Sequence, residues 1–262
     1  MRLQVGARTD TGRVRTLNED VFLLRPEQGL FLVCDGMGGC PAGEVASEMA
    51  ALSILEHVSR REKPAVPRAA QDDDYLPQSR RLRRAVERSN QYIYERSQAD
   101  PDRAGMGSTV VGAWIRGPIV SVAHVGDSRA YLWHRNRLAR LTRDHSLTED
   151  GAHKNVLLRA LGREATVEVD VRELAVQPDD YLLLCSDGLT NAVPEAAVSR
   201  AIARLRDPQR ICDELVNMAN KRGGPDNITV VVVAVIGSVW QNIWEWTRRF
   251  SGGHIAAADS AS

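Results

Sequence analysis

Short apolar runs rich in β-branched residues recur along the chain and constrain its fold more than any other feature. They are predicted to be strands, because such side chains pack well on a pleated surface. Turn-like residues separate neighbouring runs, as Arg116-Gly117-Pro118 does, so the middle of the chain is predicted to form an antiparallel meander. The six runs are 31–34, 109–115, 119–125, 129–133, 181–185 and 228–236.

Apolar residues at helical spacing predict four helices. Two are expected in the first half, at 42–59 and 80–97, and two in the second, at 194–205 and 208–221. A proline-rich, charged stretch at 62–78 predicts an exposed linker between the first two. Because strands and helices do not alternate in a βαβ rhythm, we predict an α+β fold with helices packed on antiparallel sheets.

Charge and cysteine usage limit the class of protein. The 34 basic and 34 acidic residues balance, so overall charge selects neither nucleic acid nor an anionic membrane as a partner. No apolar stretch reaches the roughly 18 residues of a membrane span, and MRLQVGARTD contains no apolar signal core. The four cysteines lack metal-binding spacing and suit a reducing compartment. We therefore expect a cytoplasmic protein with one large domain.

The C-terminal segment differs from the rest of the chain. Three of the five tryptophans fall in VWQNIWEWTRRF (239–250), and helical spacing places Trp240, Ile243 and Trp244 on one face. We predict a terminal helix that docks on the domain, because only two arginines supply basic charge; a partner-binding or membrane-surface helix is the alternative. Residues 238–262 are thus expected to form an aromatic helix and a disordered tail.

Acidic residues with a glycine or proline beside them recur at the ends of the predicted strands. Each alone is an ordinary turn signal. Together they suggest one site, because loops at one end of a sandwich would gather them, and gathered carboxylates need a cation to neutralise them. The positions are Asp35-Gly36, Gly126-Asp127, Asp187-Gly188 and Pro225-Asp226, to which we add Glu19-Asp20.

The ligand chemistry indicates a cation and a reaction. Carboxylates and glycine carbonyls, without a His/Cys cluster, favour Mg²⁺ or Mn²⁺, and their spread along the chain excludes an EF-hand. Two such ions best serve an in-line displacement at phosphorus, so the pattern predicts a phosphoester hydrolase. Arg15, four residues before Glu19, could grip two phosphoryl oxygens, although spacing alone favours an ordinary surface arginine.

Eight motifs, taken in order, resemble the PPM family of metal-dependent serine/threonine protein phosphatases, also called type 2C, in its bacterial form. The resemblance covers about residues 1–236. It implies a β-sandwich of two antiparallel sheets flanked by helix pairs, with the metal site at one end of the sandwich. The motifs are RTLNED (15–20), DGMGG (35–39), MGSTVVGAWI (106–115), VAHVGDSRAYLW (122–133), LTRDHSLTED (141–150), RALG (159–162), LLLCSDGLTN (182–191) and GGPDNITVVVV (223–233).

The resemblance also implies a mechanism and a role for each site residue. A hydroxide bridging two Mn²⁺ or Mg²⁺ ions would attack phosphorus in line, without a phosphoenzyme. Arg15, Asp35 and Asp187 would be the catalytic residues, with Arg15 binding the substrate phosphate. In the metal site, Asp35 would bridge the two metals, and the Gly36 carbonyl, Asp187 and Asp226 would complete the ligands of that metal pair. Glu19 and Asp20 would hold the metals or their waters. Asp127 and Asp187 would bind a third, weaker metal.

Two departures from the family pattern bear on this mechanism. Met37 stands where animal relatives have a histidine proposed to protonate the leaving group, and methionine cannot donate a proton. His145 and His153 are the nearest candidates by sequence, although a structural role suits each better. In addition, only GAHKNVLL (151–158) separates DHSLTED from RALG, where bacterial relatives usually carry a longer helical flap.

The resemblance therefore predicts a cytoplasmic phosphatase for phosphoserine and phosphothreonine proteins. Residues 1–237 would form its catalytic domain, and a bacterial Ser/Thr kinase would be its opposing partner. Nucleic acid is not expected as a partner, because no basic, aromatic groove is evident. Two alternatives stay open: a non-catalytic phosphoprotein-binding module on the same fold, whose signature would be a lost metal carboxylate, and a phosphatase for small phosphomonoesters or phosphodiesters. No metal carboxylate is lost.

Overall fold

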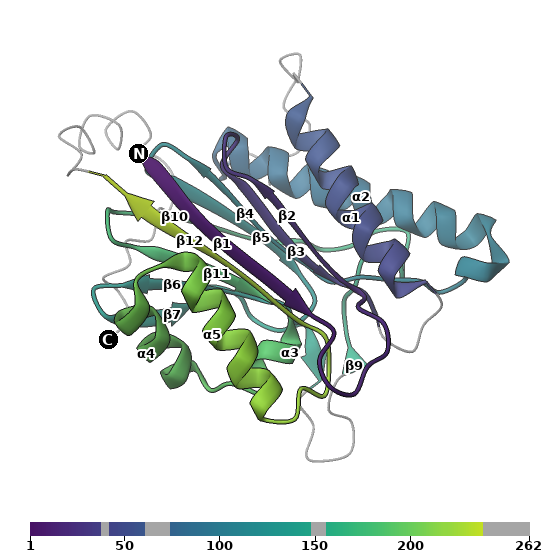
Figure 1. The fold of residues 1–262 in the computed structure, drawn as a ribbon. Helices are drawn as coiled ribbons and strands as arrows, with labels where there is room; N and C mark the ends of the chain where they lie inside the picture. The colour runs from purple at the N-terminus through teal and green to yellow at the C-terminus, as the bar shows by residue number, and fades with distance from the viewer. Residues whose placement is uncertain (38–41, 61–73, 148–155, 238–262) are drawn as a thin grey trace.

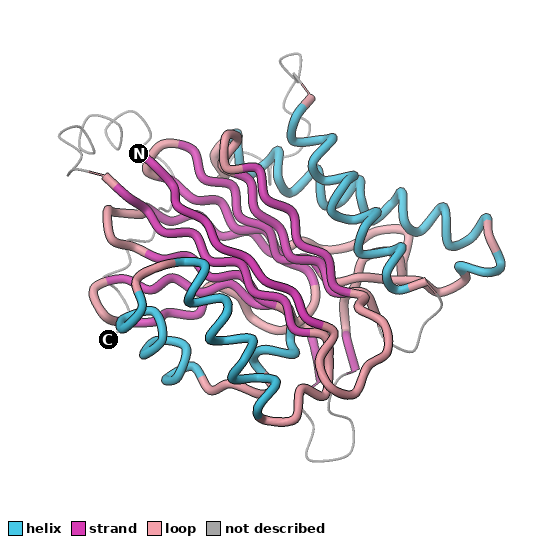
Figure 2. Tube along the Cα trace, viewed as in Figure 1, coloured by secondary structure: helices cyan, strands magenta, loops and turns pink. Residues whose placement is uncertain are grey.

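Ten of the described strands form two antiparallel sheets of five strands each, which pack face to face (Figure 2). The structure is a computed structural model and describes residues 1–37, 42–60, 74–147 and 156–237. Its strands are β1 (Arg2–Asp10), β2 (Asp20–Arg25), β3 (Leu30–Asp35), β4 (Val110–Arg116), β5 (Ile119–Val125), β6 (Arg129–His134), β7 (Arg137–Arg140), β8 (Ser146–Leu147), β9 (Val156–Leu157), β10 (Asp170–Ala175), β11 (Tyr181–Cys185) and β12 (Ile228–Ile236).

The inner faces of the two sheets form a common core. One sheet has the order β1-β12-β11-β6-β7 and the other β10-β5-β4-β3-β2, while β8 and β9 form a separate ribbon. Along β12, Val231 and Val233 belong to the core between the sheets, whereas Val230 and Val232 belong to the core on the outer face. A strand buried on both faces needs a continuous apolar run, which explains the sequence ITVVVVAVI.

Two helix pairs cover the outer faces of the sheets (Figure 1). The pairs are α1 (Gly43–Ser59) with α2 (Pro77–Ala99) and α4 (Glu195–Leu205) with α5 (Pro208–Lys221), and the short elements η2 (Pro101–Arg103) and α3 (Asp187–Thr190) lie between them in sequence. Ile54 of α1 and Leu82 of α2 share a core with Leu32 of β3. The predicted α+β sandwich flanked by helix pairs is therefore confirmed. No helix in the described ranges is long and apolar enough to cross a membrane.

Parts of the sequence-based assignment differ from the structure. The linker predicted at 62–78 is wrong at its end, because Pro77 occupies the first turn of α2, where its missing N–H leaves no hydrogen bond unmade. The prediction also omits the short strands β8 and β9 and the strands β1, β7 and β10, which lack a continuous apolar run; β1, for example, mixes buried and exposed positions. It misses β2 as well, although β2 contains the four-residue apolar run VFLL. Residues 61–73 and the aromatic segment 238–262 lie outside the described residues.

Candidate active site

A pocket at one end of the sandwich gathers the predicted site residues. Glu19 and Asp20 lie beside it: the Glu19 carbonyl accepts from the Gly36 N–H at 3.1 Å, and Asp20 pairs with Asp35 across β2 and β3. The structure therefore brings together all the positions proposed from the sequence, although they are scattered from 15 to 226. The pocket itself is lined by Arg15, Asp35, Gly36, Met37, Thr109, Asp127, Leu157, Asp187 and Asp226.

Strand ends explain this convergence. Asp35 is the last residue of β3, and its register partner Asp20 is the first residue of β2. Asp187 begins α3, separated from the end of β11 by Ser186, and Asp127 lies in the turn between β5 and β6. Because neighbouring strands run antiparallel, the end of one strand lies beside the start of the next. Figure 1 shows α3 and the loop that follows β1 at the same end of the sandwich.

Gly36 allows three backbone segments to meet beside the pocket. A Cβ atom at this position would lie 2.3 Å from the Gly43 carbonyl oxygen and 2.8 Å from the Glu19 carbonyl oxygen, closer than real Cβ contacts. The Ser47 hydroxyl donates to the same Glu19 carbonyl at 2.6 Å, which ties α1 to this point. The glycine is therefore required for close backbone approach at the proposed ligand position.

Asn227 supports the site and was not singled out by the sequence analysis. Its side-chain oxygen accepts from the Glu19 N–H at 2.8 Å, and its side-chain nitrogen donates to the carbonyls of Thr11 and Leu17 at 2.9 Å each. These bonds hold the loop that carries Arg15. The available signal was its place in the motif GGPDN, but sequence spacing does not reveal contacts between such distant positions.

Arg15 lines the pocket and has a carboxylate beside it. Its Nη2 donates to Asp226 Oδ2 at 2.9 Å, and its side chain is 39% exposed. The hydrogen bond to Asp226 raises the pKa of the guanidinium, which stays charged. Since a guanidinium has five N–H donors, one bond to Asp226 leaves donors for an incoming phosphoryl group.

Several carboxyl groups around the pocket have raised pKa values. Burial is the largest cause for each, and neighbouring acidic groups add repulsion. The pKa rises to about 7 for Asp20 and for Asp187, and to about 6 for Asp127. The pKa of Asp35 lies well above its usual range, and burial also raises that of Glu19. A cation among these groups would favour their ionised forms.

The donor set fits a hard divalent cation. Asp20 is only 6% exposed; its Oδ2 accepts from the Ser186 hydroxyl at 2.7 Å, whereas its buried Oδ1 has no hydrogen-bond partner. Mg²⁺ and Mn²⁺ prefer oxygen ligands, and either would satisfy such an oxygen and offset the gathered negative charge. Asp20, Asp35 and Asp187 are therefore suited to hold a metal.

The metal-free protein is expected to become less stable as the pH rises toward neutrality. When the pKa of an acid is raised by folding, the folded state retains a proton that the unfolded state has released. The free energy of unfolding then falls between the unfolded pKa, near 4, and the folded pKa. For Asp20 and Asp187 this window ends at about 7. In EDTA we expect Tm to fall by about 5–10 °C between about pH 5 and pH 8.

Added Mn²⁺ should reverse this loss, because the bound ion compensates the ionised carboxylates. The increase in Tm on adding Mn²⁺ should thus be larger at pH 8 than at pH 5, which differential scanning fluorimetry measures directly. A metal-free Tm that rises over this pH range would contradict the raised pKa values.

The described pocket lining contains no histidine that could protonate the leaving group. Met37 lines the pocket but has no proton to give. The suggestion of His145 from the sequence is not supported, because this residue is buried outside that lining and its ring bonds Gly126 and Asp170. His153, the other suggestion, lies outside the described residues.

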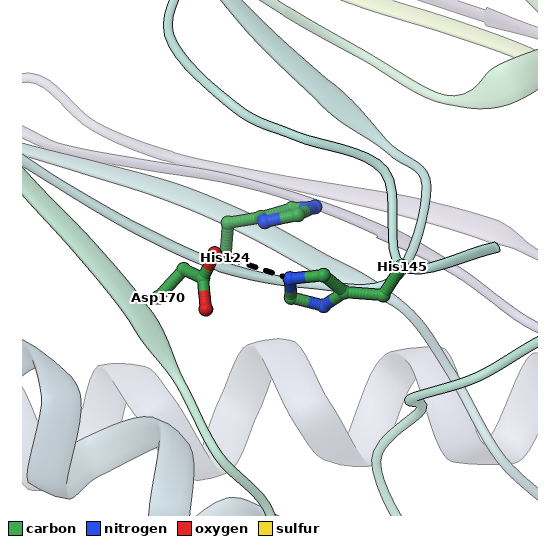
Figure 3. Close-up of side chains that lie close together, drawn as sticks. All are labelled: His124, His145 and Asp170. Atoms are coloured by element: carbon green, nitrogen blue, oxygen red, sulfur yellow. Dashed lines mark ion pairs between the residues drawn. The ribbon is translucent and has the colours of Figure 1, made fainter.

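The structure also contains a histidine cluster that the sequence spacing does not predict. His124, His145 and Asp170 place one potential ligand atom each within 4.8 Å of one another (Figure 3). The pairing of β5 with β10 sets His124 opposite Asp170 in register, which explains how residues so distant in sequence meet. The sequence-based expectation concerned the ligands of the strand-end acids, and this cluster lies outside the described lining of the carboxylate pocket.

The chain is similar to known phosphatases over most of its length. The family model described as protein phosphatase 2C matches residues 11–228. The serine/threonine phosphatase stp of Listeria welshimeri is 41% identical over 243 residues, covering 86% of this chain and 93% of the relative.

Solved structures agree with these sequence matches. That of the Mycobacterium tuberculosis serine/threonine phosphatase PstP/Ppp is 30% identical, with a TM-score of 0.77 and coverage of 90% of this chain and 100% of that one. The catalytic domain of PstP in complex with two manganese ions gives a TM-score of 0.76 at 30% identity, with coverage of 90% and 99%.

Proposed function

The chain belongs to the protein phosphatase 2C family, and from this premise we propose that its carboxylate pocket removes phosphate from phosphoserine and phosphothreonine in proteins. The enzyme class predicted from the sequence, a serine/threonine protein phosphatase, is confirmed by these relatives. The observation that carries the proposal is the meeting of Asp35, Asp127, Asp187 and Asp226 with Arg15 in one pocket. Acids would hold the metal there, and the arginine would bind the phosphate.

We propose that two divalent cations occupy the pocket. Bound Mn²⁺ or Mg²⁺ would supply a deprotonated water for attack on phosphorus and neutralise phosphate charge. The proposed ligands keep the roles given above: Asp35 as the bridge, the Gly36 carbonyl, Asp187 and Asp226, with Glu19 and Asp20 holding the metals or their waters, and Asp127 with Asp187 holding a third, weaker ion.

Side chains of the protein itself would bind the phosphate and orient the site. Arg15 would bind phosphoryl oxygens, and its bond to Asp226 would hold the guanidinium in the pocket lining. Asn191 donates to Asp187 Oδ2 at 3.1 Å, which orients that carboxylate before substrate arrives. The Thr109 hydroxyl accepts from the Asp35 backbone N–H at 3.2 Å, which fixes the backbone at the end of β3.

Hydrolysis of a phosphothreonine peptide tests the proposal against its alternatives. We expect turnover with Mn²⁺ and none with EDTA. Binding of the peptide without turnover under any metal condition would favour a non-catalytic phosphoprotein-binding module. Turnover of p-nitrophenyl phosphate with no activity on phosphopeptides or phosphoproteins would favour a phosphatase for small phosphomonoesters.

Replacing Asp127 by asparagine is expected to lower kcat by at least about tenfold while tight Mn²⁺ binding persists. The reason is that Asp127 is proposed to serve only the weaker, third ion. Steady-state kinetics with p-nitrophenyl phosphate and isothermal titration with Mn²⁺ measure the two effects. The matched control is Asp213→Asn on α5, whose side chain is 44% exposed and outside the described pocket. Wild-type turnover by Asp127→Asn would remove the proposed role.

We further propose a cytoplasmic location, an opposing Ser/Thr kinase and a catalytic domain that ends near residue 237. The location is supported by Cys34, Cys185 and Cys212, which are buried free thiols. The domain limit is supported by β12, which pairs along its length with β1 and ends at Ile236. The kinase is proposed because phosphorylated proteins, the expected substrates, require an enzyme that forms them.

A further inference from the structure

The cluster of His124, His145 and Asp170 lies behind the turn that carries Asp127. His145 Nε2 is 3.2 Å from Asp170 Oδ2, the ion pair drawn as a dashed line in Figure 3. The two imidazole rings lie 4.4 Å apart between centroids, and both histidines are buried. Arg159 completes the group, because its Nη1 donates to Asp170 Oδ1 at 3.0 Å.

Hydrogen bonding argues against a metal in this cluster. The Gly126 N–H donates to His145 Nδ1 at 3.2 Å, so the proton of the neutral ring is on Nε2, which faces Asp170. A metal would need the lone pair of that nitrogen. A metal at His145 Nε2 would also be repelled by the positive charge of the Arg159 guanidinium, whose Nη1 is 3.3 Å from that nitrogen. The cluster is therefore a hydrogen-bond network.

This network holds the peptide groups of Gly126 from both sides. The Gly126 N–H donates to the His145 ring, while the Gly126 carbonyl accepts from the His145 backbone N–H and from His124 Nε2, both at 2.8 Å. The backbone N–H and the carbonyl of Gly126 are thus both hydrogen-bonded to the same two histidines.

Gly126 is also fixed by its backbone conformation. Its φ of +110° lies in the region that favours glycine, and a Cβ atom there would lie 2.7 Å from the side chain of Thr109. Thr109 lines the active-site pocket, and so does Asp127, the residue that follows Gly126. A small rotation of the Gly126 peptide would therefore redirect the Asp127 carboxylate.

We propose that His145, oriented by Asp170 and Arg159, is a positioning residue that fixes the Gly126 peptide and so aims Asp127 into the active-site pocket. The proposal rests on the function proposed above for Asp127 as a metal ligand. Groups that orient a metal ligand from behind typically change metal affinity or activity by about 10–100-fold when they are lost. The proposal thus extends the metal site to residues that never touch the metal.

Two substitutions of His145 separate its contacts. In His145→Asn, the amide oxygen can take the place of Nδ1 and accept from the Gly126 N–H, but the bond to Asp170 is lost. In His145→Gln, the amide can reach toward Asp170 but leaves the Gly126 N–H without its acceptor. Asp170→Ala is a third variant, which removes the side chain that orients His145 and keeps the imidazole itself.

The experiment measures Mn²⁺-dependent kcat for p-nitrophenyl phosphate, Mn²⁺ binding by electron paramagnetic resonance of the free ion, and Tm in EDTA. For His145→Gln we expect the Mn²⁺ concentration for half-maximal activity to rise by about tenfold, with weak binding lost and tight binding retained. His145→Asn should stay within about threefold of wild type, because its amide oxygen accepts from the Gly126 N–H without needing Asp170. Asp170→Ala should shift in the same direction as His145→Gln, because the imidazole without Asp170 can place its proton on Nδ1 and lose the bond from Gly126.

The wild-type enzyme and Asp127→Asn separate the two proposals. If Asp127→Asn has wild-type kinetics, the role of Asp127 itself is wrong. If Asp127→Asn is impaired but His145→Gln and Asp170→Ala lower only Tm and keep the wild-type Mn²⁺ dependence, the positioning role of His145 is overturned. Equal impairment of His145→Asn and His145→Gln would also overturn the positioning role, because keeping an acceptor for the Gly126 N–H would then make no difference to activity.

Discussion

Replacing Asp35 by asparagine is expected to lower kcat/KM for a phosphothreonine peptide by about a thousandfold. This loss corresponds to about 4 kcal/mol of transition-state stabilisation. Asp35 ends β3 inside the pocket and is the proposed bridge between two cations, so its charge is required where phosphate binds. Steady-state kinetics at saturating Mn²⁺ measure the effect.

The same variant should be more stable than wild type when no metal is present. Burial and the charges of Asp20 and Asp187 raise the pKa of Asp35 well above its usual range, so the uncharged amide removes an unfavourable group. We expect Tm in EDTA to equal or exceed that of wild type, and the Tm increase on adding Mn²⁺ to shrink. A lower Tm with a proportional loss of activity would instead indicate simple misfolding.

Asp213→Asn is the matched control for this experiment. Asp213 is a partly exposed aspartate on α5 that pairs with Arg8 at 3.5 Å. It should keep wild-type kinetics and the wild-type response to Mn²⁺. If Asp35→Asn retained more than about a tenth of the wild-type kcat/KM, the bridging role would be wrong.

The second large effect is expected at Arg15. Arg15→Ala should lower kcat/KM by about a hundredfold, mainly through kcat, because a guanidinium can bind two phosphoryl oxygens as negative charge develops. Arg15→Lys should recover only part of the loss, since an ammonium group lacks the planar fork. Kinetics with both a phosphopeptide and p-nitrophenyl phosphate test whether the phosphate group itself is recognised.

Arg13→Ala provides the control from the same loop. Arg13 is exposed, its backbone N–H donates to the Gly224 carbonyl, and the residue is not part of the described pocket lining. Its loss should change kcat/KM by less than about threefold. If Arg13→Ala and Arg15→Ala were equally impaired, loop stability would explain the result and phosphate binding by Arg15 would be contradicted.

The sequence predicted those parts of the fold that depend on continuous apolar patterns. β11 and β12 are buried on both faces, and their runs YLLLC and ITVVVVAVI were assigned correctly. β1 pairs along its whole length with β12, yet its mixed sequence RLQVGARTD gives no such signal. Its strand conformation depends on the partner strand, which sequence periodicity does not include.

The same limit applies to the site. Acids beside glycine or proline at strand ends were visible in the sequence, and the family resemblance supplied the roles proposed for them. Asn227 and His145 were harder to predict, because their importance comes from bonds to Glu19 and Gly126 across the fold. An asparagine or histidine in a sequence does not show which backbone group it will hold.

Anomalous diffraction from crystals grown with Mn²⁺ tests the central claim most directly, because it locates the metal without reference to activity. The account predicts two strong peaks at the manganese absorption edge in the pocket, in contact with Asp35, Asp187 and Asp226. It also predicts no peak at His124, His145 and Asp170. A pocket without manganese, or a manganese ion held by that histidine cluster instead, would contradict the account.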